Sequence, residues 1–281
     1  MIIVIGGHGQ LGQCLQKVGK STDTVFLSSK DLDITKAQEI EEYLSKQPSS
    51  SIVINCSAYT AVDKAEDEKE AAFQVNHLGV KNLALACEKF KLKLIHISTD
   101  YVFDGKSHSH YSESDLPNPQ SIYGSSKLAG EKEIETICSS YIIIRTSWLY
   151  SEYSSNFVKS ILRLAKERDQ LGIVADQVGT PTYAIDLAKC ILSLTLKFQE
   201  GAREVLHFSN EGVASWYDFA YEVVSISKKE CSISPIETSD YPTKAERPPF
   251  SVLNKKKIKK LYKITIPHWK ESLKLCLKNL Y

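Results

Sequence analysis

The chain has 281 residues, of which 42% are hydrophobic and 25% charged, and its formal net charge is +1. This balance is typical of a globular protein and gives no electrostatic reason to expect a nucleic-acid or membrane partner. The first apolar run is only five residues long, and no run approaches the ~18 residues of a membrane span. Seven cysteines without a C-x-x-C pair indicate reduced thiols, so we expect a cytoplasmic protein.

Strands and helices alternate through the first half of the chain. Apolar runs predict strands at 1–5, 24–28, 51–58, 93–99 and 141–146. Helices are expected directly after residues 6–12, at 34–47 with Thr35 as the N-cap, at 69–90, and over the segment that holds Tyr123 and Lys127. This alternation indicates right-handed βαβ units, and hence an α/β fold with a doubly wound parallel sheet.

The alternation becomes less regular after about residue 147. We expect helices at 155–171, 182–198 and 215–227, the last opened by Ser215, and strands at 172–176 and 204–209. A Pro-rich segment covers 241–254. It is followed by a basic cluster at 254–263, which we interpret as a solvated helix face because the net charge of the chain is near zero.

Three glycines separate the first strand from the first helix. Gly6, Gly9 and Gly12 form the pattern G-x-x-G-x-x-G, with Gln10 and Leu11 between the last two. Glycines at such a turn let the backbone approach a pyrophosphate, and the helix N-terminus offers free N–H groups and a partial positive charge. The pattern therefore predicts a dinucleotide site in a Rossmann-type fold, with these five residues around the cofactor.

The end of the second strand bears on the choice of cofactor. An acid at this place would hold the adenosine 2′-OH of NAD, but the chain has Ser28, Ser29 and Lys30. Hydroxyls and an ammonium suit a 2′-phosphate better, so NADP(H) is preferred and NAD(H) stays possible. Asp33 is expected near the adenine, or alternatively as a cap of the next helix.

A tyrosine and a lysine stand four residues apart in "SIYGSSKLAG". Tyr123 and Lys127 therefore share a helix face, and an ammonium beside a phenol lowers the pKa of that phenol. Thr99 ends the strand at 93–99 and should reach the same edge of the sheet. Beside a dinucleotide, Thr99 would hydrogen-bond a carbonyl oxygen and Tyr123 would donate its proton. Lys127 would lower the pKa of Tyr123 and hold the nicotinamide ribose.

Longer motifs extend along nearly the whole chain: GGHGQLG, NCSAYTAVDKAE, VNHLGVKNLA, STDYVFDG, YGSSKLAGE, RTSWLY, DQVGTPTY and ERPPFSVL. With these motifs the chain resembles the extended short-chain dehydrogenase/reductases, and within them the dTDP-4-dehydrorhamnose reductase family. The resemblance implies reduction of the C4 ketone of dTDP-4-dehydro-β-L-rhamnose to dTDP-L-rhamnose, a step in cell-surface polysaccharide biosynthesis. It implies a small dTDP-sugar substrate, no nucleic-acid or membrane partner, and a monomer or homodimer.

The resemblance also assigns roles to individual positions. Ala58 and Tyr59 would line the cofactor, and Asn76 would support the active site from its helix. The residues expected to contact the sugar are Thr60, Val62, Tyr101 and Trp148. Those expected at the nucleotide diphosphate are Asn156, Gln177, Thr180, Pro181 and Arg247, where the Arg247 guanidinium suits bidentate phosphate contact. The predicted dinucleotide-binding Rossmann domain covers 1–147 and about 174–205. The smaller C-terminal α/β substrate domain covers about 148–173 and 206–281.

One departure from the family and two rival functions remain. Some members of the family dimerise through a metal bridged by carboxylates, and one of these positions is Cys14 here, so we expect no structural metal. The nearer rival is a reductase of a related keto nucleotide sugar. The more distant one is a non-enzymatic regulatory subunit resembling the methionine adenosyltransferase beta subunit, against which the intact Thr99, Tyr123 and Lys127 argue.

Overall fold

The protein is described by a computed structural model that covers residues 1–19 and 23–280. In this part of the chain the main sheet has six strands in the order β2–β1–β3–β4–β5–β10, and all neighbouring strands are parallel. The strands are β1 (Ile2–Ile5), β2 (Thr24–Leu27), β3 (Ile52–Asn55), β4 (Lys93–Thr99), β5 (Tyr141–Thr146) and β10 (Arg203–His207). The predicted parallel sheet is confirmed.

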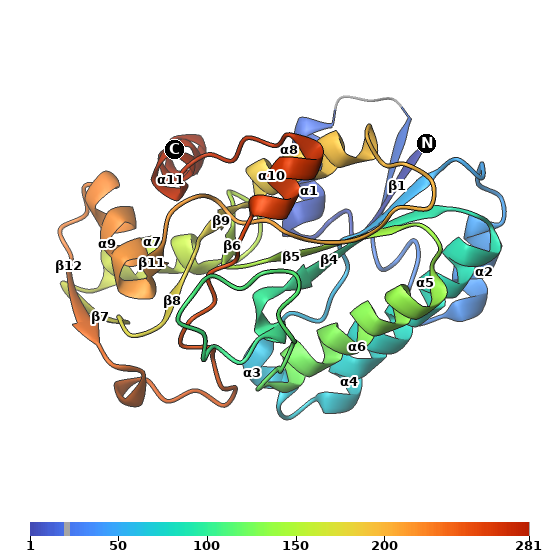
Figure 1. The fold of residues 1–281 in the computed structure, drawn as a ribbon. Helices are drawn as coiled ribbons and strands as arrows, with labels where there is room; N and C mark the ends of the chain where they lie inside the picture. Colours follow the sequence, from blue (N-terminus) through green and yellow to red (C-terminus); the bar gives the residue numbers. More distant parts are fainter. Residues whose placement is uncertain (20–22, 281) are drawn as a thin grey trace.

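Helices cover both faces of this sheet (Figure 1). On one face lie α1 (Gln10–Val18) and α8 (Ala184–Thr195), and on the other lie α2 (Ala37–Leu44), α5 (Val80–Lys89) and α6 (Ile122–Ile137). Alternate residues of β1 separate accordingly, because side chains along a strand point to opposite faces. Val4 belongs to the core with α1 and α8, whereas Ile3 and Ile5 belong to the core with the other helices. The sheet is therefore doubly wound, as predicted.

The strand order places a topological switch point between β1 and β3. In open α/β sheets, ligands bind outside the carboxyl ends of the strands at such a point. Gly6 follows β1 with a φ of 78°, and a Cβ there would lie 2.7 Å from the backbone nitrogen of Ser57. Only glycine fits this turn without strain. The loops after β1 and β3 thus meet at the edge where a dinucleotide is expected.

Element boundaries in the first half differ from the predictions at the first three strands and at the start of α2. Strands 93–99 and 141–146 are confirmed to the residue, whereas β1, β2 and β3 are shorter than predicted. The prediction of Thr35 as an N-cap is wrong: α2 begins at Ala37, and the Thr35 hydroxyl and backbone N–H both bond to Asp33. Asp33 draws Thr35 into a local turn, which competes with capping.

The long helix predicted at 69–90 is interrupted. It consists of α4 (Lys69–Phe73), a π-helical segment (Gln74–Gly79) and α5, and a short helix α3 (Val62–Ala65) precedes it. π-helical turns inside α-helices often mark functional sites. Here the segment carries Asn76, one of the predicted site residues.

The second half adds short sheets beside the main one. Helix α7 (Phe157–Glu167) ends before the predicted 171 because Gln170–Val174 form strand β7, which pairs with β12 (Ser232–Ile236), a strand the sequence analysis missed. Strand β10 crosses the predicted domain boundary at 205–206, so the division into two domains stays a prediction. Ser215 caps α9 (Trp216–Ile226) through a capping box, as predicted. The remaining strands and α-helices of the described residues are β6 (Leu149–Tyr150), β8 (Val178–Gly179), β9 (Thr182–Tyr183), β11 (Ala214–Ser215), α10 (Lys256–Tyr262) and α11 (Trp269–Leu280). Across the described chain, the helices are all too short or too polar to span a bilayer.

Candidate active site

Thr99 and Tyr123 meet at the carboxyl edge of the sheet. Thr99 is the last residue of β4, and Tyr123 lies in the first turn of α6, whose N-cap Ser121 accepts a hydrogen bond from the backbone N–H of Gly124 at 3.1 Å. The Thr99 hydroxyl lies close enough to the Tyr123 phenol to lower the pKa of that phenol. The ring of Tyr101 packs edge-on against Tyr123, with 5.5 Å between the centroids. The structure thus brings two of the predicted proton-transfer groups close together.

The protonation of Tyr123 differs from the prediction. Burial raises the pKa of Tyr123 to about 12, while the nearby Thr99 side chain lowers it and the charge of Asp100 raises it further. The predicted lowering by Lys127 is therefore wrong for this structure. The phenol keeps its proton at neutral pH, which suits a proton donor.

Lys127 is directed into the sheet. Its Nζ donates a 2.7 Å hydrogen bond to the carbonyl of Ile97 and lies 3.2 Å from Nε2 of His96, and the side chain is almost completely buried. In this direction its charge is not among the causes that shift the pKa of the Tyr123 phenol. Burial lowers the pKa of Lys127 to about 8.

Asn76 connects three parts of the site. Its Oδ1 accepts from the backbone N–H of Tyr59 at 2.9 Å, and its Nδ2 donates to the Tyr59 carbonyl and to the hydroxyl of Ser126, both at 3.0 Å. Ser126 lies in α6 between Tyr123 and Lys127. Asn76 therefore holds the loop after β3, which includes Ala58, against the helix that carries the tyrosine.

The glycine loop fits a dinucleotide pyrophosphate. Gly9 is the N-cap of α1 and provides no side-chain cap, so the first N–H groups of the helix are available for an anion. Leu11 is buried in the core, and Gln10 bridges to the other half of the chain by donating to the Leu149 carbonyl at 3.2 Å. These contacts place the loop firmly, and the cradle left by Gly6 and Gly9 is shaped for a phosphate-bearing cofactor.

An acid missed in the sequence analysis stands where the adenosine ribose is expected. Asp31 accepts hydrogen bonds from the backbone and the hydroxyl of Ser28 at 2.8 and 2.6 Å, and the hydroxyl contact is the main cause that lowers the pKa of Asp31. Ser29 and Lys30 are exposed beside it. The predicted pocket of hydroxyls and an ammonium therefore also contains a carboxylate. Asp33 bonds to Thr35 instead, at 2.8 Å.

A cavity of about 700 Å³ opens beside the reacting edge. Of the predicted substrate residues, Tyr101, Gln177 and Arg247 line it. Trp148 lies next to it, stacked on Trp216 of the cavity wall with 3.5 Å between the ring centroids. Trp148 has a φ of 48°, a strained conformation for a bulky residue that is often found at functional sites. Together these side chains form an aromatic wall suited to a sugar or a base.

Arg247 of the cavity wall is already paired with Asp63, an acid of helix α3. Its two terminal nitrogens bond to the two carboxylate oxygens of Asp63 at 3.0 and 2.7 Å. The hydrogen bond from Arg247 is the main cause that lowers the pKa of Asp63. A diphosphate at this place would bind Arg247 together with the Asp63 carboxylate or displace that carboxylate.

The remaining predicted residues have structural partners. Asn156 is the N-cap of α7, and its Nδ2 donates to Gln10 at 3.0 Å. The Thr180 hydroxyl donates to the Gly212 carbonyl at 2.9 Å, and Pro181 beside it is buried. Thr60 is exposed and Val62 begins α3. Substrate contacts of these residues stay predictions.

Sequence reasoning missed side chains whose partners lie far away in the chain. Asn55 and His96 contact each other and lead to Lys127, Asp63 pairs with Arg247, and Trp216 stacks on Trp148. Asn55 and His96 sit opposite each other on β3 and β4, and a polar residue inside an apolar strand was the available signal. Asp63 lies within a motif already quoted, but its partner is 184 residues away.

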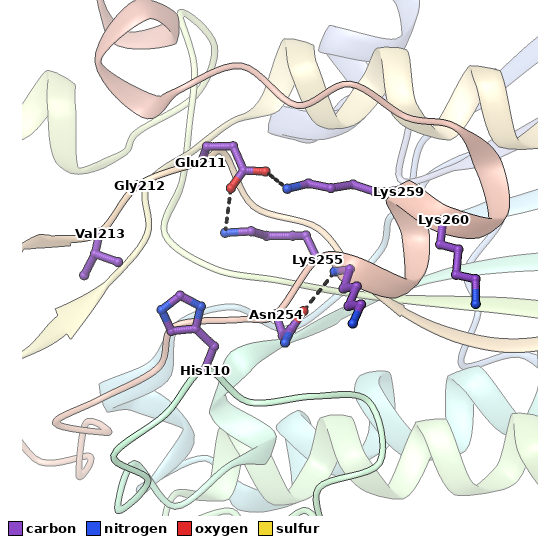
Figure 2. Close-up of a pocket in the computed structure, with 9 residues that line it drawn as sticks. His110, Glu211, Gly212, Val213, Asn254, Lys255, Lys259 and Lys260 are labelled. Carbon is purple, nitrogen blue, oxygen red and sulfur yellow. Dashed lines mark hydrogen bonds and ion pairs between the residues drawn. The ribbon is translucent and has the colours of Figure 1, made fainter.

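A second hollow, of about 530 Å³, lies away from this site (Figure 2). It is lined by part of the basic cluster, and Figure 2 shows Lys255 and Lys259 both directed at the carboxylate of Glu211. Lys255 is buried, and burial lowers its pKa.

In residues 1–19 and 23–280, no group of three or more His, Cys, Asp or Glu side chains is arranged to hold a metal ion. Cys14 is buried, and burial raises its pKa to about 12.

Comparison with known proteins identifies relatives along nearly the whole chain. A dTDP-4-dehydrorhamnose reductase of Aggregatibacter actinomycetemcomitans is 39% identical over 286 residues, which cover 97% of each chain. The crystal structure of a Clostridium acetobutylicum dTDP-4-dehydrorhamnose reductase has a TM-score of 0.93 at 39% identity and 99% coverage of both chains. That of the Bacillus anthracis enzyme in complex with NADP has a TM-score of 0.94 at 37% identity, covering 99% of this chain and 98% of the other. The RmlD substrate binding domain model matches residues 1–281, and the chain therefore belongs to the RmlD substrate binding domain family.

Proposed function

We propose that this protein reduces the C4 ketone of dTDP-4-dehydro-β-L-rhamnose to dTDP-L-rhamnose, with NADPH as the reductant. The observation that carries the proposal is that Thr99 and Tyr123 lie close together at the carboxyl edge of the sheet, next to a cavity that reaches Tyr101. The substrate follows from the family and from the relatives that bear the name of this activity.

The side chains divide the proton transfer among them. A bound NADPH supplies the hydride that adds to C4. The Thr99 hydroxyl hydrogen-bonds the ketone oxygen, and Tyr123 gives that oxygen its phenolic proton. Lys127, in its ammonium form, would hold the nicotinamide ribose, and once its Nζ turns from the Ile97 carbonyl toward that ribose it would also stabilise the phenolate that remains. The phenolate then recovers a proton from solvent, which completes the balance of one hydride and one proton for each alcohol formed.

The cofactor is proposed to be NADPH, with NADH as the alternative. The NADP complex of the Bacillus anthracis relative supports this choice, as does Lys30, an exposed lysine that follows Ser28 and Ser29 in the same turn. Asp31 acts in the other direction, because a carboxylate repels a 2′-phosphate and accepts hydrogen bonds from a ribose. The preference for NADPH over NADH therefore depends on the balance between Lys30 and Asp31 in one short turn.

The dTDP-sugar would occupy the cavity of about 700 Å³. Trp148, Trp216 and Tyr101 offer ring faces and edges to the sugar or base. Arg247 offers a two-pronged contact to the diphosphate once it exchanges Asp63 for the ligand.

The seven cysteines are all free, which is typical of proteins from a reducing compartment. We propose a cytoplasmic location for the reaction, with the protein acting as a monomer or homodimer.

The test is NADPH oxidation, followed by absorbance, with dTDP-4-dehydro-6-deoxyglucose and its 3,5-epimerase. We expect rapid oxidation that requires the epimerase, and slower oxidation of NADH in a parallel reaction. Oxidation without the epimerase would instead identify a reductase of a related keto sugar. Absence of oxidation in a protein that still binds NADPH would contradict the proposal and favour a regulatory subunit.

A further inference from the structure

A chain of buried polar groups connects the end of β3 to Lys127. It begins at Asn55, whose Oδ1 accepts from the backbone N–H of Ser57 at 3.0 Å and from the Ser57 hydroxyl. A backbone N–H can only donate, so the amide of Asn55 cannot be reversed without setting two donors against each other. Its Nδ2 therefore points at His96, 3.1 Å from Nδ1.

The orientation of Asn55 determines the tautomer of His96. Because Nδ2 of Asn55 is a donor, Nδ1 of His96 must be an unprotonated acceptor. Burial, followed by the charge of Lys127, lowers the pKa of His96 well below its usual value, so the ring is neutral. A neutral imidazole carries one N–H, and here that N–H is on Nε2. Nε2 lies 3.2 Å from Nζ of Lys127.

This tautomer presents a donor to Lys127. An ammonium has three donors and no acceptor, whereas a neutral amine has a lone pair that can accept. Nζ still donates to the Ile97 carbonyl at 2.7 Å, which an amine can also do. We infer that Asn55 and His96 are positioning residues that shift Lys127 from its ammonium toward its neutral amine before the cofactor binds. The side chains of all three residues are at most 1% exposed, too buried for solvent to relieve the mismatch.

The other titratable groups near Lys127 counteract the lowering of its pKa only weakly. Glu131, one turn further along α6, raises the pKa of Lys127, but its carboxylate is bound to Arg145 of β5 at 2.6 Å. Cys56, after β3, also raises it, yet burial raises the pKa of that thiol to about 12 and so keeps it neutral. The net result of burial and these charges is a pKa of about 8 for Lys127.

The consequence rests on the proposed function. A reductase of this type needs Lys127 as an ammonium when the phenolate forms, and the negative charge of a bound dinucleotide favours that form. Binding of the cofactor would then draw a proton onto Lys127. The ammonium that stabilises the phenolate would then be more fully populated in the loaded enzyme than in the free one, with the largest difference above pH 8.

The experiment titrates Lys127 directly, without substrate. Protein labelled with ¹³C in its lysine side chains is followed by NMR against pH, and the Lys127 signal is assigned from its loss in Lys127→Met. We expect a midpoint near 8 in the free protein and a higher one with NADPH. A midpoint of ~10.4, the ordinary value for lysine, would overturn the inference whether or not the protein turns over a dTDP-sugar.

Two variants separate the tautomer from simple charge effects. In Asn55→Asp, the carboxylate accepts from Nδ1–H of His96, so that Nε2 becomes an acceptor for the ammonium. In His96→Asn, the shorter amide still accepts from Asn55 but no longer presents an N–H to Lys127, and no charge is added. Both should raise the midpoint by about one pH unit or more.

Asn118→Asp, which adds a carboxylate on the exposed surface, is the matched control and should leave the midpoint unchanged. A rise in Asn55→Asp alone would mean that charge, not the tautomer, is responsible, and would overturn the inference. Thermal unfolding verifies that each variant is folded. If Asn55→Asp does not fold, the neutral His96→Asn decides the question by itself.

Discussion

The reacting edge and the cavity beside it both contain a cation placed for a ligand, but the two cations are held differently. Lys127 is buried among a carbonyl and an imidazole, and its pKa is lowered to about 8. Arg247 is 23% exposed and keeps its charge in a two-pronged bond to Asp63. The charge of Lys127 can therefore change, while that of Arg247 is fixed and only its partner can change. We expect the edge to govern chemistry and the cavity to govern binding.

The strongest test of this division is Tyr123→Phe. Loss of the phenolic proton should lower kcat by about 10²–10⁴-fold, the usual range for a positioned proton donor. The ring and its contact with Tyr101 remain, so the affinity for NADPH, measured by fluorescence, should be nearly unchanged. Turnover at the wild-type rate would show that another group supplies the proton.

Arg247→Ala should weaken substrate binding in the cavity and leave the chemical step almost unchanged. Loss of a charge-assisted contact to the diphosphate, worth ~1.5–3 kcal/mol, should raise the KM for the dTDP-sugar by about 10–100-fold with a much smaller change in kcat. Arg163→Ala is the matched control, because Arg163 is an exposed arginine paired with Glu167 on α7. Equal KM values for the two variants would remove Arg247 from the diphosphate site.

The pH dependence sharpens the comparison at the edge. If reduction needs the ammonium of Lys127, kcat/KM reports the free enzyme and should fall above a pKa of about 8. The decrease should approach tenfold per pH unit, because one proton is lost. Tyr123, with a pKa of about 12, does not titrate in this range. A flat profile up to pH 10 would exclude Lys127 as the titrating group, whereas Arg247→Ala should keep the wild-type profile.

The smallest expected effect is that of Asp63→Asn. The Asp63 carboxylate competes with a diphosphate for Arg247, but a partly exposed ion pair is worth only ~0.2–1 kcal/mol. The KM for the dTDP-sugar should therefore fall by a few-fold while kcat stays the same. A rise in KM would mean that Asp63 orients Arg247 for the substrate instead of competing with it.

The sequence was most informative where periodicity and local spacing decide the structure. Strands β4 and β5 were predicted to the residue because both are apolar runs buried in the sheet, and the shared face of Tyr123 and Lys127 follows from helical spacing. The direction of Lys127 could not be predicted, because the groups that receive it, His96 and the Ile97 carbonyl, come from another strand.

Long-range contacts explain the other differences. The π-helical segment depends on Asn76 reaching Tyr59 and Ser126 at once, which no local pattern specifies. Strand β12 exists through its pairing with β7, some 60 residues earlier in the chain. Asp31 was overlooked because it lies one turn beyond the strand end where an acid was expected.

The most direct test of the central claim is isotope transfer from NADPH that carries deuterium on the reactive face of its nicotinamide C4. The enzyme is incubated with this cofactor, dTDP-4-dehydro-6-deoxyglucose and the epimerase, and the sugar product is examined by NMR and mass spectrometry. The account predicts dTDP-L-rhamnose with one deuterium at its C4. Recovery of unreduced sugar, or deuterium at any other carbon, would contradict it.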